Sequence, residues 1–437
     1  MDYKMEDVKD LEAKPEWLLG KRINEVAFCQ EFLREHPLVC VGDSFYSMDG
    51  RIPDLRGLSR MIYEKLRPWV TWGGVAAQVE RLLALLRQEC YMEELPTYQD
   101  RIMIADGTLW LDGGFTQDKC FCRNRLPVFY SPGGKAPQRW LDFLNELLWP
   151  EDIPTLQEYL GYCLLPTTRA QKMLMLVGRG GEGKSRIGAV VRAIFGDSMV
   201  QNSIAKIETN RFARADLEGA LVMVDDDMQM EALPQTNYLK AIVTAELPMD
   251  LEKKSKQSYQ GELYVRFLGF GNGSLKALYD RSEGFFRRQI ILNVKPKDRQ
   301  RVDDPNLSEK LVKERDAIFL WCFEGLQRLR ANNYRFTVSQ RSRAALAAAF
   351  RDANNVEEFL RSKGYISFFS EAESSSKELY RAYRQWCDDN TGYPLSARSF
   401  SSWLVEHQER LGLRHTNNIY LAGGRRVRGF IGVDTLV

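Results

Sequence analysis

The strongest hydrophobic pattern in the chain lies in its middle, between residues 172 and 196. Five consecutive apolar residues, 173–177, predict a strand that is buried on both faces. A glycine-rich turn follows them. Apolar residues then recur at helical spacing from Ile187 to Ile194, and Gly196 can end that helix. The pattern predicts a strand, a glycine-rich loop and a helix in direct succession.

Helices dominate the pattern of the N-terminal third. Residues 24–36 place Val26 and Phe28 inward, and residues 79–90 carry leucines at helical spacing. Residues 137–165 are helical again. We expect this last pair of helices to pack directly under the strand and loop described above.

Two short hairpins interrupt the N-terminal helices. FYSMDGRI turns at Asp49-Gly50, and RIMIADGTLWLDGG turns at Asp106-Gly107. No set of catalytic side chains occurs in this part of the sequence. We therefore expect residues 1–166 to form a mainly helical domain with an architectural or oligomer-forming role.

The pattern changes twice after residue 296. Residues 297–352 read as a helical extension, in which residues 307–329 form one long amphipathic helix. Over residues 353–437, three helices and a short strand lead into a basic hairpin, IYLAGGRRVRGFIGV. That order predicts a winged helix, a module that binds DNA or protein. The candidate DNA contacts are arginines of its last helix and its hairpin, Arg398, Arg425, Arg426 and Arg428.

Composition changes this picture little. The 437 residues are 44% hydrophobic and 27% charged, as in ordinary soluble proteins, and the net charge of +2 says little about partners. No apolar run approaches the roughly 20 residues that span a bilayer. The first ten residues do not resemble a signal peptide. We expect a cytoplasmic protein without membrane contacts. Eight cysteines without a CxxC pair and three histidines leave little for a zinc site or histidine chemistry.

The glycine-rich turn carries the best-defined chemistry. KMLMLVGRGGEGKS fits the pattern G-x-x-x-x-G-K-[ST], which binds phosphates through backbone N–H groups at a helix N-terminus. We assign Lys184 to the β- and γ-phosphates of ATP and the Ser185 hydroxyl to Mg²⁺. The alternative is a plain glycine turn between a strand and a helix. The predicted nucleotide site is completed by the loop glycines, Gly178, Gly180, Gly181 and Gly183.

A second apolar run ends in three aspartates, in the sequence ALVMVDDD. A carboxylate at the carboxyl end of a buried parallel strand beside the P-loop strand can hold Mg²⁺, and a second one can orient the attacking water. We assign Asp225 to Mg²⁺ and Asp226 to the water. A shift by one residue stays open, because three aspartates are consecutive, and an acidic turn is the non-catalytic alternative.

Two further positions could complete an ATPase site. Asn272 follows a predicted strand, 264–270, where an amide can contact the γ-phosphate or its water; the alternative is a turn former. Arg287 and Arg288 precede another strand and could stabilise the transferring phosphoryl group from a neighbouring subunit. A solvated basic pair is the alternative there.

A lysine-rich hairpin is predicted between the aspartates and Asn272. MDLEKKSKQSYQGELYV reads as two strands joined by a polar turn. Lysines beside an aromatic side chain suit a nucleic-acid backbone with a stacked base, although a solvated hairpin tip is the alternative. The candidate DNA contacts are Lys253, Lys254, Lys256 and Tyr259.

The order of these motifs resembles that of the superfamily 3 helicases. GRGGEGKS, VMVDDD, the lysine hairpin, the strand ending in GN and DRSEGFFRR follow one another within about 110 residues. The chain looks most similar to the phage and plasmid primase-helicase family, and the resemblance covers nearly its whole length. It implies a multidomain α/β fold, with an AAA+-like P-loop core over residues 167–296 between the helical N-terminal domain and the winged helix.

The resemblance also implies an activity and partners. Family members form homohexameric rings that hydrolyse ATP with Mg²⁺ between subunits and translocate on single-stranded DNA, usually 3′ to 5′; the winged helix would meet duplex DNA. By position, Asn272 matches the sensor and Arg288 the arginine finger, with Arg287 as its neighbour. Glu182 departs from the asparagine that the family commonly has, and brings a negative charge near the phosphates. The sequence also lacks a primase-like set before residue 150, so a primase would act in trans.

We therefore expect a DNA helicase for the replication of a phage, a plasmid or an integrated mobile element. The first alternative is an initiator that uses ATP only to assemble on an origin. The second is a P-loop ATPase that remodels proteins. Strand separation on forked DNA distinguishes the helicase from the initiator, and DNA stimulation of ATP hydrolysis distinguishes both from the remodelling ATPase.

Overall fold

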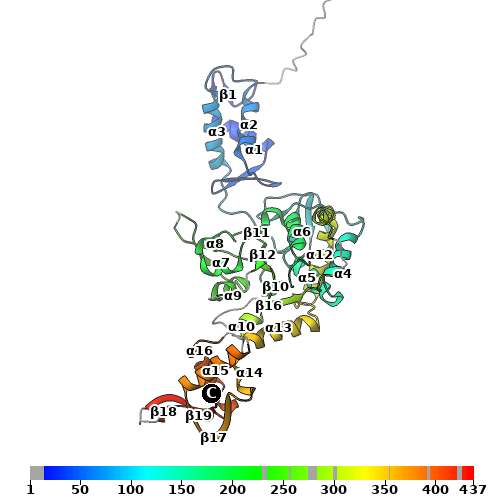
Figure 1. The fold of residues 1–437 in the computed structure, drawn as a ribbon. Helices are drawn as coiled ribbons and strands as arrows, with labels where there is room; N and C mark the ends of the chain where they lie inside the picture. The colour runs from blue at the N-terminus through cyan, green and yellow to red at the C-terminus, as the bar shows by residue number, and fades with distance from the viewer. Residues whose placement is uncertain are drawn as a thin grey trace, which may run out of the picture. The chain divides into compact units, whose positions relative to one another are not determined.

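The computed structural model describes residues 14–228, 233, 235–254, 257–273, 283–298, 303–353, 355–390, 394–420 and 426–437. Two compact units are present (Figure 1). One comprises Met1–Gly134 with Ile194–Ser198, and the other Lys135–Ala193 with Met199–Val437. The first boundary therefore lies at residue 134 and not at the expected residue 166, because the helices that follow Gly134 pack within the second unit.

The helices of the first unit enclose a core of aromatic and aliphatic side chains. They are α1 (Glu25–Glu35), α2 (Leu55–Leu66) and α3 (Val75–Glu89). Asn24 begins α1 by accepting a hydrogen bond from the Ala27 amide at 3.2 Å. Phe28 is buried as predicted, but Val26 is 46% exposed. The prediction for Val26 was wrong because two residues are about 200° apart around a helix, so Val26 and Phe28 face opposite sides.

Short strands make up the rest of the first unit, which is less helical than the sequence pattern indicated. Both predicted hairpins are confirmed: Ser47 pairs with Gly50, and Ile104 pairs with Gly107. The strands form sheets in the orders β1-β2, β3-β4-β5 and β8-β7-β6-β9. Their bounds are β1 (Leu18–Leu19), β2 (Arg22–Ile23), β3 (Leu38–Val41), β4 (Ser44–Ser47), β5 (Gly50–Arg51), β6 (Arg101–Ile104), β7 (Gly107–Trp110), β8 (Phe115–Thr116) and β9 (Arg125–Leu126).

A parallel sheet of five strands forms the centre of the second unit, in the order β11-β12-β15-β10-β16. The predicted strand before the glycine-rich loop is β10, and the strand that ends in aspartates is β12. We expected these two strands to be neighbours, but β15 lies between them. The strand bounds are β10 (Met173–Val177), β11 (Met199–Gln201), β12 (Val222–Met228), β15 (Arg266–Gly271) and β16 (Gln289–Asn293).

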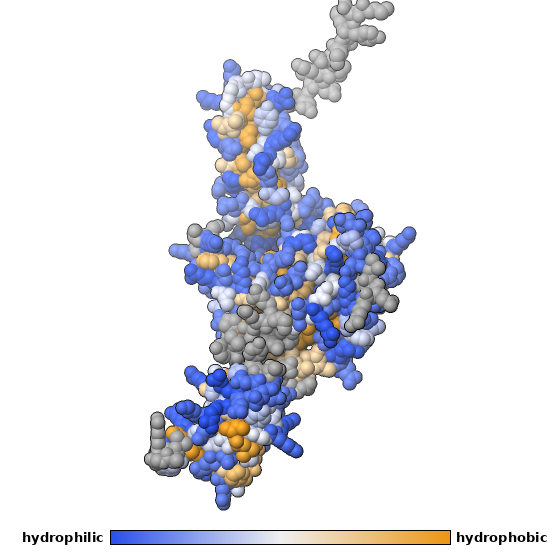
Figure 2. All heavy atoms as spheres, viewed as in Figure 1, coloured by the Kyte–Doolittle hydropathy of each residue, from blue (hydrophilic) through white to orange (hydrophobic). Residues whose placement is uncertain are grey.

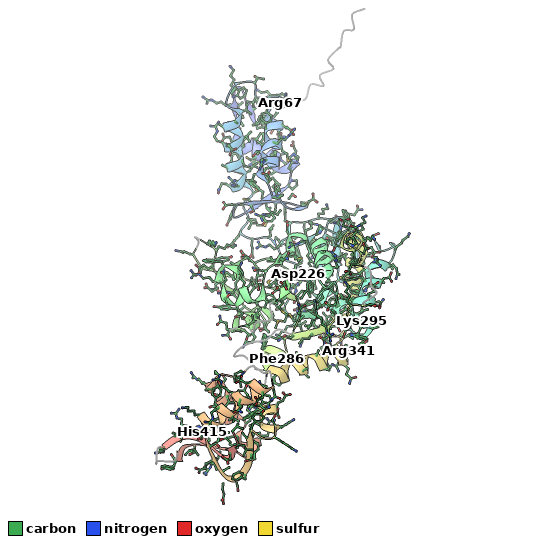
Figure 3. All side chains as sticks on the ribbon, in the orientation of Figure 1. Arg67, Asp226, Phe286, Lys295, Arg341 and His415 are labelled. Atoms are coloured by element: carbon green, nitrogen blue, oxygen red, sulfur yellow. The ribbon has the colours of Figure 1, made fainter. Side chains whose placement is uncertain are left out.

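Helices and one antiparallel hairpin surround this sheet. Phe286 of α10 packs edge-to-face on Phe350 of α13, with ring centroids 5.3 Å apart (Figure 3). The hairpin pairs Met249 with Gly261, as the lysine-rich sequence predicted. The elements are α6 (Ser185–Phe195), α7 (Ile204–Thr209), α8 (Arg211–Ala215), α9 (Asn237–Val243), β13 (Met249–Leu251), β14 (Tyr259–Gly261), α10 (Glu283–Phe286) and α13 (Gln340–Ala353). The short helix that follows α6, η2 (Gly196–Ser198), belongs to the first unit.

The helices after residue 134 pack under the sheet, as predicted. They are α4 (Gln138–Leu147), η1 (Pro150–Asp152) and α5 (Ile153–Tyr162). The Tyr159 hydroxyl donates to the carbonyl of Phe267 in β15 at 2.6 Å. α5 also lies backbone to backbone against α12 (Arg315–Ala331), because Gly161 and Gly325 let the two helices approach. A Cβ atom on either glycine would overlap the backbone of the other helix.

The single long helix expected over residues 307–329 is instead two helices, α11 (Leu307–Val312) and α12. The break falls at Lys313 and Glu314. The Glu314 carboxylate accepts hydrogen bonds from the amides of Arg139 and Trp140, at 3.2 and 3.0 Å, and so binds the first turn of α4. This contact with a helix far away in sequence has no signature in the local pattern.

The C-terminal segment has the predicted elements in the predicted order, with one further short helix before the hairpin, and it has its own core. Its sheet has the order β17-β19-β18 with antiparallel pairing. Ser375 and Glu378 form a reciprocal cap at the start of α15. The elements are α14 (Val356–Arg361), β17 (Ile366–Ser375), α15 (Ser376–Asp389), α16 (Ala397–Glu406), α17 (Gln408–Leu411), β18 (Arg414–Tyr420) and β19 (Arg426–Thr435).

Hydrophilic side chains cover most of the face of each unit that Figure 2 draws. Within the described part of the chain, no helix is both long and apolar enough to cross a membrane. The eight cysteines are free thiols, and most of them are buried.

Candidate nucleotide-binding site

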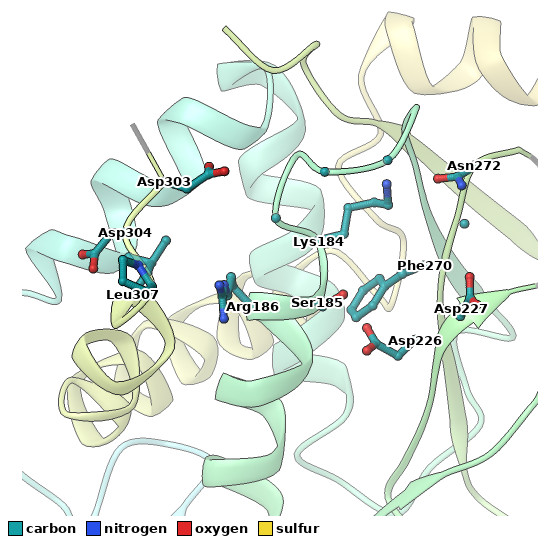
Figure 4. A pocket seen from close by; sticks show the side chains of 15 residues that line it. Lys184, Ser185, Arg186, Asp226, Asp227, Phe270, Asn272, Asp303, Asp304 and Leu307 are labelled. Atoms are coloured by element: carbon teal, nitrogen blue, oxygen red, sulfur yellow. The ribbon is translucent and has the colours of Figure 1, made fainter. Parts of the chain in front are cut away.

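A cavity of about 590 Å³ lies at the carboxyl ends of β10, β12 and β15. Crevices at this edge of a parallel sheet are the usual ligand sites of open α/β folds. The glycine-rich loop forms one wall, and the ends of β12 and β15 form another (Figure 4). A segment after β16, residues 303–307, closes the far side. The cavity is large enough for a small organic ligand.

The loop has a shape that requires glycine. Gly180, Gly181 and Gly183 have φ angles of 104°, 80° and 104°, a region that residues with a Cβ atom rarely adopt. All three line the cavity together with Lys184 and Ser185, which begin α6. Gly178, the first residue of the motif, is not among the lining residues. The first turn of α6 adds free N–H groups and the positive end of a helix dipole to this wall.

Glu182 lies beneath the loop and not in the cavity. Its carboxylate forms an ion pair with the Lys184 ammonium, with Oε2 and Nζ 2.9 Å apart, and both side chains are buried. Oε2 also accepts a hydrogen bond from the Gly180 amide at 3.0 Å, and Oε1 accepts one from the Arg179 amide. Burial alone would raise the pKa of Glu182. The hydrogen bonds from Lys184 and from loop amides outweigh burial, so the pKa lies below its ordinary value.

The three aspartates of β12 do not face the same way. Asp226 and Asp227 line the cavity. Asp225 does not: it is 5% exposed, and its Oδ2 atom accepts a hydrogen bond from the Ile204 amide at 2.7 Å, at the start of α7. Burial raises the pKa of Asp225 despite this bond. The position of Asp225 speaks against its assignment to Mg²⁺ and leaves the one-residue shift open. The register of β12 is irregular between Asp225 and Met228, and Asp226 and Asp227 both line the cavity although regular alternation would turn them to opposite faces.

Asn272 lies where the sequence predicted, at the end of β15 and on the cavity wall. Its side chain is exposed and close to the loop, since a Cβ atom on Gly180 would be 3.7 Å from the Asn272 Oδ1 atom. The neighbouring positions Phe270 and Gly271 line the same wall. β15, which lies between β10 and β12, thus places the Asn272 amide between the glycine-rich loop and the aspartates of β12.

Arg287 and Arg288 lie at the amino ends of the parallel strands, whereas the glycine-rich loop lies at their carboxyl ends. β16 runs parallel to β10, with Met173 beside Gln289 and Val177 beside Asn293. The arginines precede β16, whereas the loop follows β10, so about 13 Å of strand separates them. Arg287 is exposed, but Arg288 is partly buried and its guanidinium donates to the Gly284 carbonyl. Neither arginine lines the cavity of its own chain.

The predicted DNA-binding hairpin has internal partners. The Lys253 ammonium lies 2.6 Å from the Glu218 carboxylate and 5.1 Å from the centre of the Tyr259 ring. The Tyr259 hydroxyl donates to the same carboxylate at 2.8 Å. Lys254 is exposed, and Lys256 lies outside the described residues. Lys253 and Tyr259 therefore hold the hairpin to the segment before β12, a role that the sequence did not indicate.

The C-terminal arginines occupy the predicted elements. Arg398 is exposed in the first turn of α16, and Arg428 is exposed in β19. Arg426, also in β19, is exposed; it donates to the Asn417 carbonyl at 3.2 Å and to the Asn418 side chain. Arg425 lies outside the described residues.

Several lining residues were missed by the sequence analysis. Asp227 was recognised only as a possible shift, and the carboxylates of Asp303 and Asp304 were not considered. Arg186, whose guanidinium donates to the Ser308 hydroxyl at 2.8 Å, was also missed. For Asp303 and Asp304, the signal in the sequence was the acidic pair of DDP, residues 303–305, after β16. Among the described residues, no group of three or more His, Cys, Asp or Glu side chains could hold a metal by itself.

Comparison with known proteins gives a family of unknown function and a fold. Residues 176–288 match the model of the family described as "Family of unknown function (DUF5906)". No curated protein matches the chain. Three solved structures of the NrS-1 C-terminal region in apo form are similar, with TM-scores of 0.52, 0.54 and 0.51 at 11%, 10% and 11% identity. Each covers 93% of this chain, and 98% or 99% of the NrS-1 region is covered in return.

These likenesses bear on different parts of the chain. The family match spans the glycine-rich loop, the aspartates of β12, the lysine hairpin and the arginine pair, which is the stretch that the sequence motifs singled out. The structural likeness extends over nearly the whole chain, and at this level of identity it concerns the fold. The structural likeness agrees with the mixed α/β fold of this chain and its central parallel sheet.

Proposed function

We propose that this protein is an ATP-dependent DNA helicase, similar to superfamily 3 helicases, with a P-loop core and a C-terminal winged helix. One observation carries the proposal. The loop with Lys184 and Ser185, the aspartates Asp226 and Asp227, and the amide of Asn272 come from the ends of three strands and meet around one cavity. These are the groups that phosphoryl transfer from a nucleoside triphosphate requires.

The loop itself supports the assignment of an anion site. A carboxylate, that of Glu182, already accepts hydrogen bonds from two loop amides and pairs with Lys184. These donors are therefore oriented to bind oxygen atoms that carry negative charge, as a phosphate group does. The site fits a polyphosphate at the loop, with Mg²⁺ beside Ser185 and Asp226.

Each group has a defined role in this proposal. Lys184 and the amides of the first turn of α6 bind the phosphate oxygens, and Asp227 orients the attacking water as its proton acceptor. Asn272 holds the same water or the γ-phosphate in line. Ser185 and Asp226 would hold Mg²⁺, which would supply positive charge next to the phosphates. An exposed arginine of a neighbouring subunit, Arg287, completes the site, which is why the proposal includes a ring of identical chains.

DNA binding is proposed for two surfaces. Lys254 of the hairpin would contact the phosphates of a single strand in the ring. Arg398 and Arg428 of the C-terminal segment would contact duplex DNA, since both are exposed on a segment in which helices precede a basic hairpin. The same segment favours one alternative, an initiator that binds duplex origin DNA and assembles with ATP but does not separate strands.

The test compares the full-length parent protein with two lysine variants. Lys184→Ala should abolish ATP hydrolysis measured with and without single-stranded DNA, whereas Lys206→Ala, which removes an exposed lysine of α7, should not. The parent should hydrolyse ATP faster with DNA and should displace a strand from a forked duplex. Unchanged hydrolysis by Lys184→Ala would contradict the nucleotide site. Assembly on duplex DNA without strand displacement would favour the initiator.

A further inference from the structure

We propose that Glu182 is an internal anion, which occupies the phosphate-binding donors of the loop until a phosphate group displaces it. The inference rests on the proposed function, since it concerns nucleotide binding at the same loop. It assigns to Glu182 the role of a positioning residue that acts through Lys184 and sets the strength of nucleotide binding.

The donor set around the Glu182 carboxylate is the one that a phosphate group would take. Lys184 Nζ lies 2.9 Å from Oε2, the Gly180 amide donates to the same atom at 3.0 Å, and the Arg179 amide donates to Oε1. Two successive backbone amides and an ammonium group form a recurring anion-binding arrangement in proteins. Here the anion belongs to the loop itself.

The pair fits closely into the loop, with no room for a larger first residue. A Cβ atom on Gly178 would lie 2.8 Å from both Glu182 Oε2 and Lys184 Nζ, and 2.5 Å from a methyl group of Val294. The Glu182 side chain is 3% exposed and that of Lys184 is 9% exposed. Because water is nearly excluded, the attraction between the two charges is stronger than it would be at the surface.

The structure also offers a place for the displaced carboxylate. Glu182 lines a second hollow, of about 420 Å³, which shares Asp304 and Leu307 with the first cavity. Arg139, Lys295 and Lys297 contribute positive charge to this hollow, and Glu146, Asp298 and Asp304 contribute negative charge. Rotation of the Glu182 side chain into the hollow would free Lys184 for a phosphate and leave the carboxylate among side chains of both signs.

The consequence is a weaker affinity for phosphate than the loop would have without Glu182. An incoming polyphosphate must compete with the Glu182 carboxylate for Lys184. The negative charge of that carboxylate also repels the phosphates. Hydrogen bonds to charged groups are strong, so removal of the competing Glu182 charge should raise the affinity for phosphate about tenfold. The same competition would speed the departure of ADP after hydrolysis.

The experiment measures displacement of a fluorescent ADP analogue by three probes: Mg-ADP, tripolyphosphate and adenosine. Glu182→Gln keeps the size and one acceptor oxygen but removes the charge. It should bind Mg-ADP and tripolyphosphate about tenfold more tightly than the parent, with adenosine binding unchanged. KM for ATP should fall by a similar factor, without a gain in kcat.

Two variants make the result specific. Glu371→Gln removes an exposed charge of β17 that lines neither cavity, and it should bind all three probes like the parent. Glu182→Asn is the second neutral variant if Glu182→Gln folds poorly, as judged by its thermal unfolding. Equal or weaker phosphate binding by a folded Glu182 variant would overturn the inference and make Glu182 a brace of the loop. A parent protein that binds neither Mg-ADP nor tripolyphosphate would instead contradict the proposed function.

Discussion

The carboxylate of Asp225 accepts a hydrogen bond from the backbone amide of Ile204 at 2.7 Å, while the two aspartates that follow it line the cavity beside the glycine-rich loop. One run of three identical residues is thus divided between a buried structural contact and the cavity wall. Asp225 binds an N–H group at the start of α7, which has no partner within its own helix. In the proposed function, Asp226 and Asp227 take the roles at the metal and the water.

This division predicts different effects for the three aspartates. Asp226→Asn and Asp227→Asn should each lower kcat for ATP hydrolysis by at least about a hundredfold. Asp225→Asn should keep kcat close to that of the parent, because its amide oxygen can still accept from Ile204. Asp225→Ala should lose about 1 kcal/mol of stability with the lost helix cap. Steady-state hydrolysis and thermal unfolding check these outcomes; a large loss of kcat in Asp225→Asn would restore the original assignment.

The arginine pair should act between subunits, with Arg287 as the contributing residue. Arg287 is exposed, whereas the guanidinium of Arg288 is engaged with the Gly284 carbonyl. Arg287→Ala should lower ATP hydrolysis by roughly 10³-fold, with an unchanged unfolding midpoint. Arg288→Ala should lower the midpoint, because it removes a contact that holds α10 to the start of β16.

A mixing experiment tests whether the site is shared. Lys184→Ala and Arg287→Ala lack different halves of the proposed site. A mixture of the two inactive proteins should recover part of the ATPase activity, because some interfaces then combine an intact loop with an intact arginine. No recovery in mixed oligomers, verified by mass measurement, would argue against a site between subunits.

The lysine hairpin should respond unequally to substitution. Lys254 is exposed, whereas Lys253 is paired with Glu218 and lies over the Tyr259 ring. Lys254→Ala should weaken single-stranded DNA binding and reduce the slope of log K against log salt by about 1. Lys253→Ala should weaken binding less, because its charge is already partly neutralised. Glu218→Gln should strengthen binding by releasing Lys253. Titrations over a series of salt concentrations measure all three effects; equal loss from both lysines would contradict the internal pairing.

The crossing of α5 and α12 depends on glycine. Gly325→Ala would drive a methyl group into the backbone at Gln157 and should cost about 1–3 kcal/mol of stability. Gly57→Ala in α2 is the matched control, since nothing lies within 4 Å of the Cβ position there. That change should be neutral or stabilise by up to about 1 kcal/mol, because alanine favours helix. Thermal unfolding of the two variants should shift in different directions.

Much of the local structure could be predicted from the sequence. The strand β10, the glycine-rich loop and α6 follow directly from an apolar run, a phosphate-loop pattern and a helical repeat. Both hairpins of the first unit and the order of elements in the C-terminal segment were predicted in the same way. In these segments, neighbouring residues determine the conformation through periodicity and turn chemistry.

The site was less predictable, because its geometry depends on partners far apart in sequence. The direction of each aspartate depends on the pleat of β12 and on its irregular register between Asp225 and Met228. Lys253 looked free because Glu218 lies 35 residues earlier in the sequence. The break between α11 and α12 follows from a contact of Glu314 with α4. No local pattern carries information about such contacts.

The sequence by itself determined the glycine-rich turn and the start of a helix between Gly178 and Ser185, because glycine φ angles and helix starts are local properties. Only the tertiary structure decided which side chains face that loop. The sheet order places β15 and Asn272 between the loop and the aspartates. The packing beneath the loop places the Glu182 carboxylate on Lys184. Burial and distance set the electrostatics of this site, and both arise only when the chain is folded.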